Sequence, residues 1–313
     1  MKSIFKKLCC TFVLLLSFPV AAETIKIVVP WSAGGIADKT ARLVQKSLLN
    51  HLPPGTAVVV ENHPSANGII GTRLVANNKK KETVLLLTTS LGILYQLQQA
   101  EVTELDQNLI PVAYLGSVQQ ALVASKKSNL NTISDIRATN RALFYGSSIG
   151  IGSANYLAGQ ILFDQIKKEM VQVPYKGEAD ALNAVLADTV DLVFITAKTA
   201  LQYRDRLGIL GVTGAAVGDV QSLSTNKLEN FEQSLLQLVL FANSTADPQT
   251  IKQIQNALYK TYFSNEKDNY ISAGLDIDPT ALLTADSFFV VQVPKLKSIL
   301  VNLKIDQVDT KDK

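Results

Sequence analysis

The first part of the chain alternates between short apolar runs and longer segments in which apolar residues recur every three or four positions. The apolar runs Ile25–Pro30, Ala57–Glu61 and Val84–Thr88 have the length of buried β-strands. Between them, Ala37–Leu49 and Gly68–Asn77 have helical periodicity. Strands that alternate with helices predict an α/β fold, with a mostly parallel sheet and helices on both faces.

The same alternation continues through the middle of the chain. Two helices are expected there, Ser153–Gln165 and Glu178–Ala187. The segment Ala215–Gln233 is polar and lacks periodicity, which predicts a loop. The strands expected in this region are Ala121–Ser125, Ala142–Gly146, Val171–Pro174, Val190–Ile195, Ile209–Thr213 and Leu236–Ala242.

Two further helices are expected toward the C-terminus. Asp247 is a favourable N-cap and Pro248 suits the first helical position, so a helix should begin there. A last helix is expected over about Ala285–Lys304, with a kink at Pro294 because proline removes a helical hydrogen bond.

Residues 1–22 have the pattern of an export signal. A basic start precedes the apolar run Leu8–Val20, which is too short for a confident membrane span, and Val20-Ala21-Ala22 resembles a cleavage site. We therefore expect a signal peptide that is cleaved before Glu23. An uncleaved anchor is the alternative. A lipoprotein is disfavoured because the cysteines lie at the start of the apolar run and not just after it.

Cleavage changes what the composition implies. It removes both cysteines, Cys9 and Cys10, so the exported protein has no thiol, disulfide or cysteine metal ligand. It also removes three lysines, which lowers Lys+Arg from 30 to 27 against 27 Asp+Glu. The net charge of zero gives no indication of nucleic-acid binding. No later segment has about 18 uncharged apolar residues, so we expect a soluble protein outside the cytoplasm.

The turn from Pro30 to Asp38 is the first candidate site. Gly34 and Gly35 lie between a strand and a helix, where free backbone N–H groups and the helix dipole attract anions. Glycine lets a ligand approach the backbone closely, so the turn could hold a carboxylate or a phosphate. The sequence matches neither nucleotide-binding glycine motif. A plain tight turn, with Asp38 favourable near a helix start, is the alternative.

Two later turns repeat this arrangement. The segment Tyr145–Gln160 contains serines and glycines that suit an anion or a polar ligand, although a serine-rich N-cap would look the same. In the segment Val173–Phe194, Tyr175 lies between a strand and a helix and could close over a ligand. Ordinary surface packing of Tyr175 is the alternative.

A catalytic or metal site is poorly supported by the sequence. The chain has only two histidines, His51 and His63, both in loop-like context near prolines. Ser147 and Ser148 lack the G-x-S-x-G nucleophile motif, and the spacing of His and carboxylate residues matches no standard metal site. We therefore expect no enzyme, no metal and no cofactor.

Four segments, in this order, resemble the extracytoplasmic solute receptors of tripartite tricarboxylate transporters, the Bug family. They span much of the mature chain, and the first and last, which includes V-P-Y-K-G, are the most specific. The segments are IKIVVPWSAGGIADKTARLV (Ile25–Val44), VVVENHPSANGIIGTRLVA (Val58–Ala76), FYGSSIGIGSANYLAGQ (Phe144–Gln160) and VPYKGEADALNAVLADTVDLVF (Val173–Phe194).

The resemblance implies a two-lobed periplasmic-binding-protein fold of type II, with two hinge crossings and a ligand cleft between the lobes. The implied lobes are residues 23–121 plus 240–313, and residues 122–239. The crossings should lie near Gly116–Val123 and Leu236–Ala242, with the C-terminal helices returning to the first lobe. Family ligands are typically small carboxylates, which are held by backbone amides, hydroxyls and water.

The same resemblance implies which residues bind the ligand. Asp38 is better suited to orient its loop than to touch an anion, because two carboxylates repel each other. The residues carried over by motif are Trp31, Ser32, Gly34, Gly35 and Asp38 from the first turn, with Ser147, Ser148, Gly150, Gly152, Ser153 and Tyr175 from the second lobe.

Several positions depart from the family pattern. His63–Gly68 replaces Arg-Pro-Gly-Ala-Gly-Gly, and Lys81–Val84 replaces Asp-Gly-Tyr-Thr. A Pro-rich segment is missing near Ala215–Gln233. Ile195 replaces an acidic residue that commonly follows the position of Phe194, and this loss argues against amino-acid ligands. The identity of the carboxylate, and whether these changes alter the ligand class, stay open.

The leading hypothesis is a monomeric periplasmic receptor that captures a small carboxylate and delivers it to the membrane subunits of a tripartite tricarboxylate-type carrier. A sensor of the same fold that signals to a membrane kinase is the main alternative, and the sequence does not separate the two. A secreted hydrolase is a further alternative, but it requires a nucleophile and a base in contact, and none is evident.

Overall fold

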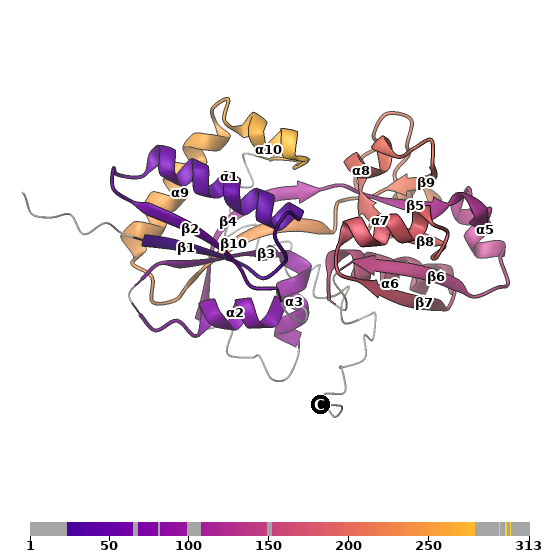
Figure 1. Ribbon diagram of the computed structural model, residues 1–313, viewed down its shortest axis with the longest axis horizontal. Helices are drawn as coiled ribbons and strands as arrows, with labels where there is room; N and C mark the ends of the chain where they lie inside the picture. The colour runs from indigo at the N-terminus through magenta and orange to yellow at the C-terminus, as the bar shows by residue number, and fades with distance from the viewer. Residues whose placement is uncertain are drawn as a thin grey trace, which may run out of the picture.

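The computed structural model describes residues 24–64, 68–80, 82–98, 108–148 and 152–278, together with Pro294, Ser298 and Val301. It has two lobes side by side, and each is built around a five-stranded sheet with helices on both faces (Figure 1). The expected α/β, two-lobed architecture is confirmed. The expected signal peptide and almost all of the helix Ala285–Lys304 lie outside the described residues.

The sheet of the first lobe has the strand order β2-β1-β3-β10-β4. β1 (Thr24–Val29) pairs in parallel with β2 (Ala57–Asn62) and with β3 (Val84–Thr89). β10 (Leu236–Asn243) runs antiparallel to β3 on one side and to β4 (Leu109–Val118) on the other. Only this late strand departs from the parallel arrangement that the sequence predicts.

Helices cover both faces of the first sheet because its strands are apolar on both sides. Ile25 and Ile27 of β1 belong to the core cluster shared with α1 (Ile36–His51) and α9 (Pro248–Tyr262), whereas Val28 belongs to the cluster on the opposite face. This alternation follows the two-residue period of a strand. The helices on the first face are α1 (Ile36–His51), α9 (Pro248–Tyr262) and α10 (Lys267–Ala273), with α2 (Ile69–Ala76) and α3 (Ser90–Gln98) on the other (Figure 1).

The second lobe repeats this design with the strand order β7-β6-β8-β5-β9. β6 pairs in parallel with β7 and β8, and β5 runs antiparallel to β8 and β9. The strands are β5 (Gln120–Ser125), β6 (Leu143–Ser148), β7 (Met170–Tyr175), β8 (Leu192–Thr196) and β9 (Leu207–Val212). The helices are α5 (Ile133–Ala138), α6 (Ala154–Ile166), α7 (Glu178–Leu186) and α8 (Ala197–Gln202), with 3-10 turns at Lys126–Ser128 and Leu223–Asn226.

Two passages of the chain connect the lobes. Gln119 alone separates β4 of the first sheet from β5 of the second, and the chain returns to the first sheet at Leu236. Strand pairing assigns Ala121 to the second sheet and residues 236–239 to the first. The sheets therefore change over a few residues away from the lobe boundaries implied by the resemblance.

Most expected elements are present, with shifted ends. Asp247 caps α9 through a bond from the Thr250 N–H (2.9 Å), as its sequence predicts. β4 was not expected, because Pro111 and Gly116 interrupt its apolar run. Proline is tolerated there because β4 lies at the sheet edge. Within the described part of the chain, no helix is both long and apolar enough to cross a membrane.

Candidate ligand-binding site

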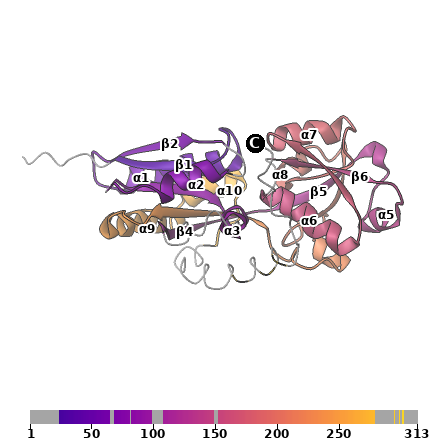
Figure 2. The ribbon, with the colours of Figure 1, turned by 90° about the horizontal axis from the view of Figure 1, so that it is seen from below.

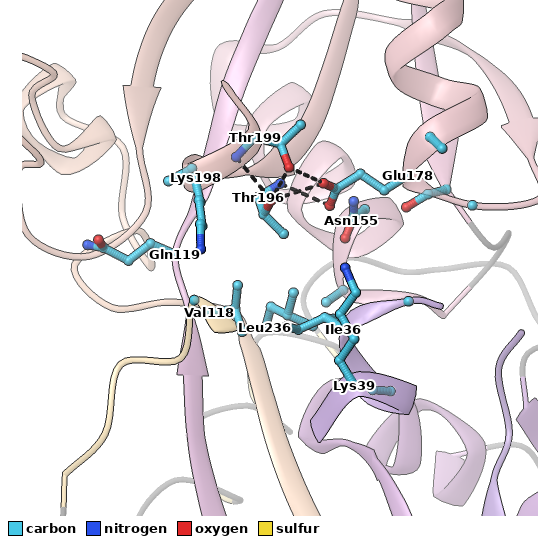
Figure 3. A pocket seen from close by; sticks show the side chains of 18 of the residues that line it. Ile36, Lys39, Val118, Gln119, Asn155, Glu178, Thr196, Lys198, Thr199 and Leu236 are labelled. Atoms are coloured by element: carbon cyan, nitrogen blue, oxygen red, sulfur yellow. Dashed lines mark hydrogen bonds between the residues drawn. The ribbon is translucent and has the colours of Figure 1, made fainter. Parts of the chain in front are cut away.

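The two lobes lie side by side along the long axis of the molecule (Figure 2). A cleft of about 1590 Å³ lies between them, and residues of both lobes line it (Figure 3). The turn between β1 and α1 forms its first-lobe wall. The end of β6, the start of α6, and the segments from β7 into α7 and from β8 into α8 form its second-lobe wall. The carboxyl ends of parallel strands thus meet at the cleft, which is where open α/β sheets bind ligands.

The first-lobe wall presents the start of α1. Gly35 is the N-cap, and no side chain caps the helix there. Among the described residues, the Gly35 N–H donates no hydrogen bond. Gly34 has φ +86°, a left-handed conformation that favours glycine, and both glycines line the cleft. An uncapped terminus of a 16-residue helix is suited to an anion.

Asp38 holds this turn from behind the cleft wall. Its carboxylate accepts bonds from the Gly34 N–H (2.9 Å) and from Arg42 Nε (3.1 Å), and its side chain does not line the cleft. Burial raises the pKa of Asp38, but these hydrogen bonds outweigh burial and hold the pKa below its ordinary value. Asp38 therefore orients the loop and stays ionised.

Asn62 is a second support of the turn, which the sequence interpretation missed. Its Nδ2 donates to the main-chain oxygen of Trp31 (3.0 Å), and it also helps to lower the pKa of Asp38. Asn62 ends β2, the strand that pairs with β1. The string Val58–Asn62 matched the family pattern, so a sequence indication was present, but its role was visible only once the strands were paired.

The second-lobe serines have different surroundings. Ser148 and Ser153 line the cleft. Ser153 Oγ caps α6 by accepting from the Tyr156 N–H (3.2 Å) and donates to the main-chain oxygen of Ser148 (2.8 Å). Ser147 lies within β6, is fully buried, and accepts a bond from Gln172 Nε2 (2.6 Å).

Seven of the eleven expected ligand-binding residues line the cleft. Ser147, Asp38 and Gly152 do not, and Gly150 lies outside the described residues. Gly152 has φ +85° and lies against the ring of Tyr95. The seven that line the cleft are Trp31, Ser32, Gly34, Gly35, Ser148, Ser153 and Tyr175.

Charged residues that the sequence interpretation did not select also line the cleft. Lys39 extends from the first turn of α1 toward the second lobe (Figure 3). Among the described residues, its side chain forms no ion pair. The remaining charged residues of the lining are Lys176, Glu178, Lys198 and Asp276.

Glu178 begins α7 on the second-lobe wall. One carboxylate oxygen, Oε1, accepts bonds from the Thr196 and Thr199 hydroxyls (2.9 Å each), and Oε2 accepts from the Thr196 N–H (3.0 Å) (Figure 3). These residues come from α7 and from the β8–α8 junction. The sequence offered no periodic or motif signal that would bring them together.

The two histidines lie away from the cleft. His51 faces Glu266 and His63 faces Glu61, each at 3.3 Å, and neither residue lines the cleft. Neither histidine is therefore placed to act as a base for Ser148 or Ser153 in the cleft wall. The cleft wall thus presents backbone N–H groups, hydroxyls and fixed charges to the cavity.

Comparison with known proteins yields both sequence and structural relatives. The UPF0065 protein in the tcbD-tcbE intergenic region of Pseudomonas sp. strain P51 is 28% identical over 203 residues, which cover 63% of this chain and 59% of that protein. BugT of Bordetella pertussis is 28% identical over 183 residues, 55% of this chain and 56% of its own. The chain thus spans between 56% and 65% of the length of the curated relatives it matches.

Solved structures show the same fold. The periplasmic binding protein BugD superposes with a TM-score of 0.76 at 22% identity, covering 91% of this chain and 98% of BugD. MatC of Rhodopseudomonas palustris, solved with bound malate, has a TM-score of 0.74 at 21% identity and covers 90% of this chain and all of MatC. A second R. palustris protein, solved with adipate, has a TM-score of 0.73 at 20% identity, covering 90% of this chain and 98% of its own.

The family model described as "Tripartite tricarboxylate transporter family receptor" matches residues 40–292, well over half of the 313-residue chain. This match confirms the resemblance inferred from the four sequence segments. The chain belongs to the tripartite tricarboxylate transporter receptor family.

Proposed function

We propose that this protein is a periplasmic receptor that captures a small carboxylate between its lobes and delivers it to a tripartite tricarboxylate-type membrane carrier. The observation that carries the proposal is the uncapped start of α1 at Gly35, which faces a cleft of about 1590 Å³. Two proteins of the same fold have been solved with the dicarboxylates malate and adipate.

Electrostatics favours an anion on the first-lobe wall. The N-terminal end of α1 carries partial positive charge, and Lys39 adds a full charge one turn into the helix. Asp38 faces away from the cleft and is neutralised by Arg42 (3.1 Å), so it does not oppose a ligand carboxylate. Lobe closure would exclude water and strengthen each of these contacts.

The proposed role is binding without catalysis, with no metal and no cofactor, in a monomeric, exported protein. Family membership supports this role, and the position of both histidines outside the cleft is consistent with it. The ligand-binding residues we propose are the seven in the cleft wall, with Asp38 as a positioning residue. Signalling to a membrane kinase would use the same lobe closure.

The test compares two substitutions at Gly35. Gly35→Pro removes the N–H that we propose faces the anion, and the native φ of −72° suits proline. Gly35→Ala keeps the N–H, and its added Cβ would lie 3.7 Å from the nearest atom, the Ser32 main-chain oxygen, which is an ordinary contact. Both variants should therefore retain cooperative thermal unfolding.

Binding is measured by titration calorimetry with succinate, malate, glutarate and adipate. We expect at least one of these to bind the unaltered protein, and Gly35→Pro to weaken it by about tenfold or more, the worth of a hydrogen bond to a charged group. Gly35→Ala should remain close to the original affinity. Equal affinities for the proline variant and the original protein would contradict the proposed anion site, as would failure of every carboxylate to bind.

A further inference from the structure

Glu178 places a fixed negative charge on the wall of a cleft proposed to bind an anion. Its carboxylate is held by three donors from the β8–α8 junction, at 2.9 to 3.0 Å. Two of these bonds go to Oε1 and one goes to Oε2. Since a carboxylate oxygen can accept two hydrogen bonds, Oε2 retains capacity for a further donor.

The structure also changes the interpretation of Ile195. In the sequence, the replacement of an acidic residue by Ile195 argued against amino-acid ligands. In the structure, Ile195 is fully buried in the core cluster shared with α7 and α8, and it does not line the cleft. Thr196, the next residue, lines the cleft and binds Glu178. The cleft therefore has an acid, supplied by α7 instead of β8.

Charges of both signs line the cleft, and Lys176 and Lys198 accompany Glu178 on the second-lobe side. The first lobe presents the N-terminus of α1 and Lys39, whereas Glu178 is the acidic residue that begins α7 across the cleft (Figure 3). Within the described residues, no ion pair joins Lys39 to Glu178. A ligand with only carboxylates would place an anion near Glu178, and the repulsion would weaken binding.

We infer that the ligand carries an ammonium group in addition to its carboxylate, and that Glu178 binds this ammonium group. The inference rests on the proposed receptor function and narrows its ligand class to amino-substituted carboxylates. In this arrangement, the ligand carboxylate meets the α1 N-terminus and Lys39 while its ammonium group donates to Glu178. Each end of the zwitterion then faces its opposite charge.

The test uses pairs of ligands that differ by one amino group: succinate against aspartate, and glutarate against glutamate. Titration calorimetry on the unaltered protein should give an affinity about tenfold or more higher for the amino member of at least one pair. Malate, which carries a hydroxyl in place of the amino group of aspartate, should bind more weakly than aspartate. These comparisons use only the unaltered protein, so they do not depend on whether a variant folds.

Glu178→Gln removes the charge at nearly constant shape. It should abolish the preference for the amino member and raise the affinity for succinate or glutarate, because the repulsion from Glu178 is removed. Asp276→Asn is the matched control, because Asp276 is a second acid in the same cleft. Asp276→Asn should keep the preference for the amino-substituted ligand. This result would show that the preference depends on Glu178 and not on the total charge of the cleft.

The outcomes separate the inference from the proposed function. If plain dicarboxylates bind and amino-substituted ones show no preference, the inference is wrong and the receptor function stands. The same holds if malate binds more tightly than aspartate, or if Glu178→Gln retains the preference. If no ligand of either kind binds the folded protein, both the inference and the carboxylate assignment are overturned.

Discussion

Lys198 of the second lobe donates a hydrogen bond from Nζ to the main-chain oxygen of Ser272 in the first lobe, over 2.6 Å. Lys198 lies on α8 and Ser272 on α10, and both line the cleft. The bond therefore joins the lobes across one edge of the cleft. Any motion that separates α8 from α10 must break it.

We expect Lys198→Met to weaken binding of every ligand by a similar factor of about two to ten, the worth of one hydrogen bond. The loss should appear mainly as faster dissociation, because the contact holds the lobes together around the ligand. Surface plasmon resonance would measure both rates. Lys176→Met is the control, since it also removes a cleft lysine. If both variants weaken ligand binding equally, the positive charge in the cleft is the cause and the bond between the lobes is not.

Asp38 should make the stability of the first lobe depend on pH in the acid range. Its folded-state pKa lies below the ordinary value of 3.8, because bonds from Gly34 and Arg42 outweigh the effect of burial. A lowered pKa stabilises the fold above the unfolded-state value and loses that contribution as the pH falls through the folded-state value. The free energy of unfolding should therefore decrease below about pH 4.

Asp38→Asn should flatten this acid dependence and lower the melting temperature at pH 7. Thermal unfolding at half-unit pH intervals, followed by circular dichroism, would measure both effects. Asp164→Asn is the comparison, because the Asp164 carboxylate is exposed and, among the residues that the structure describes, pairs only with Lys167 at 3.3 Å. If the melting temperatures of Asp38→Asn and of the original protein depend on pH in the same way, the Asp38 carboxylate does not stabilise the first lobe.

Gly152 should not tolerate a side chain. Its φ is +85°, and a Cβ there would overlap the ring of Tyr95 on α3 of the other lobe. We expect Gly152→Ala to destabilise the protein by about 1–3 kcal/mol. Gly177→Ala is the matched control, because its φ is −174° and no atom lies within 4 Å of the added Cβ. Chemical denaturation would compare them, and equal midpoints would contradict the prediction.

The Arg141–Asp191 pair should stabilise the second lobe. Asp191 accepts two bonds from Arg141 (2.8 and 2.5 Å) and one from the Phe144 N–H (2.8 Å), and its side chain is only 13% exposed. Asp191→Ala should cost about 1–3 kcal/mol, because it leaves the N–H of Phe144 and the charge of Arg141 without their partner.

The control for Asp191 is an exposed arginine–aspartate pair with a single hydrogen bond. Arg204 contacts Asp219 at 2.7 Å, but the Asp219 side chain is 70% exposed. Asp219→Ala should barely change the urea midpoint, because solvent screens exposed pairs. A larger loss for Asp219→Ala than for Asp191→Ala would contradict the assignment.

Much of the fold could be predicted from local pattern. The segments Ile25–Pro30 and Ala37–Leu49 have clear strand and helix periods, and Asp247-Pro248 has an unambiguous N-terminal signature. β4 was missed because edge position, which permits Pro111, depends on tertiary pairing. α3 was missed because Ser90–Gln98 directly follows a strand and its residues Leu91, Ile93 and Leu94 continue the apolar run of that strand.

The candidate site was only partly predictable for a related reason. Glycine-rich turns indicated Gly34 and Gly35 because backbone chemistry is visible in sequence. The second-lobe serines carried the same motif signal, yet both Ser147 and Ser148 are buried, and only Ser148 lines the cleft. Glu178 and Thr196 are 18 residues apart, and only the packing of α7 against β8 brings them together.

The position of β10 also sets an order of assembly. This strand lies between β3 and β4, yet it follows the whole second lobe along the chain. During synthesis, which starts at the N-terminus, all five strands of the second sheet are complete before residue 236 is added. Until then, the inner edges of β3 and β4 have no partner, and unpaired edges favour aggregation. The lobe that begins the chain is the last to be completed, so slow emergence of residues 236–243 would prolong the exposure of these two strand edges.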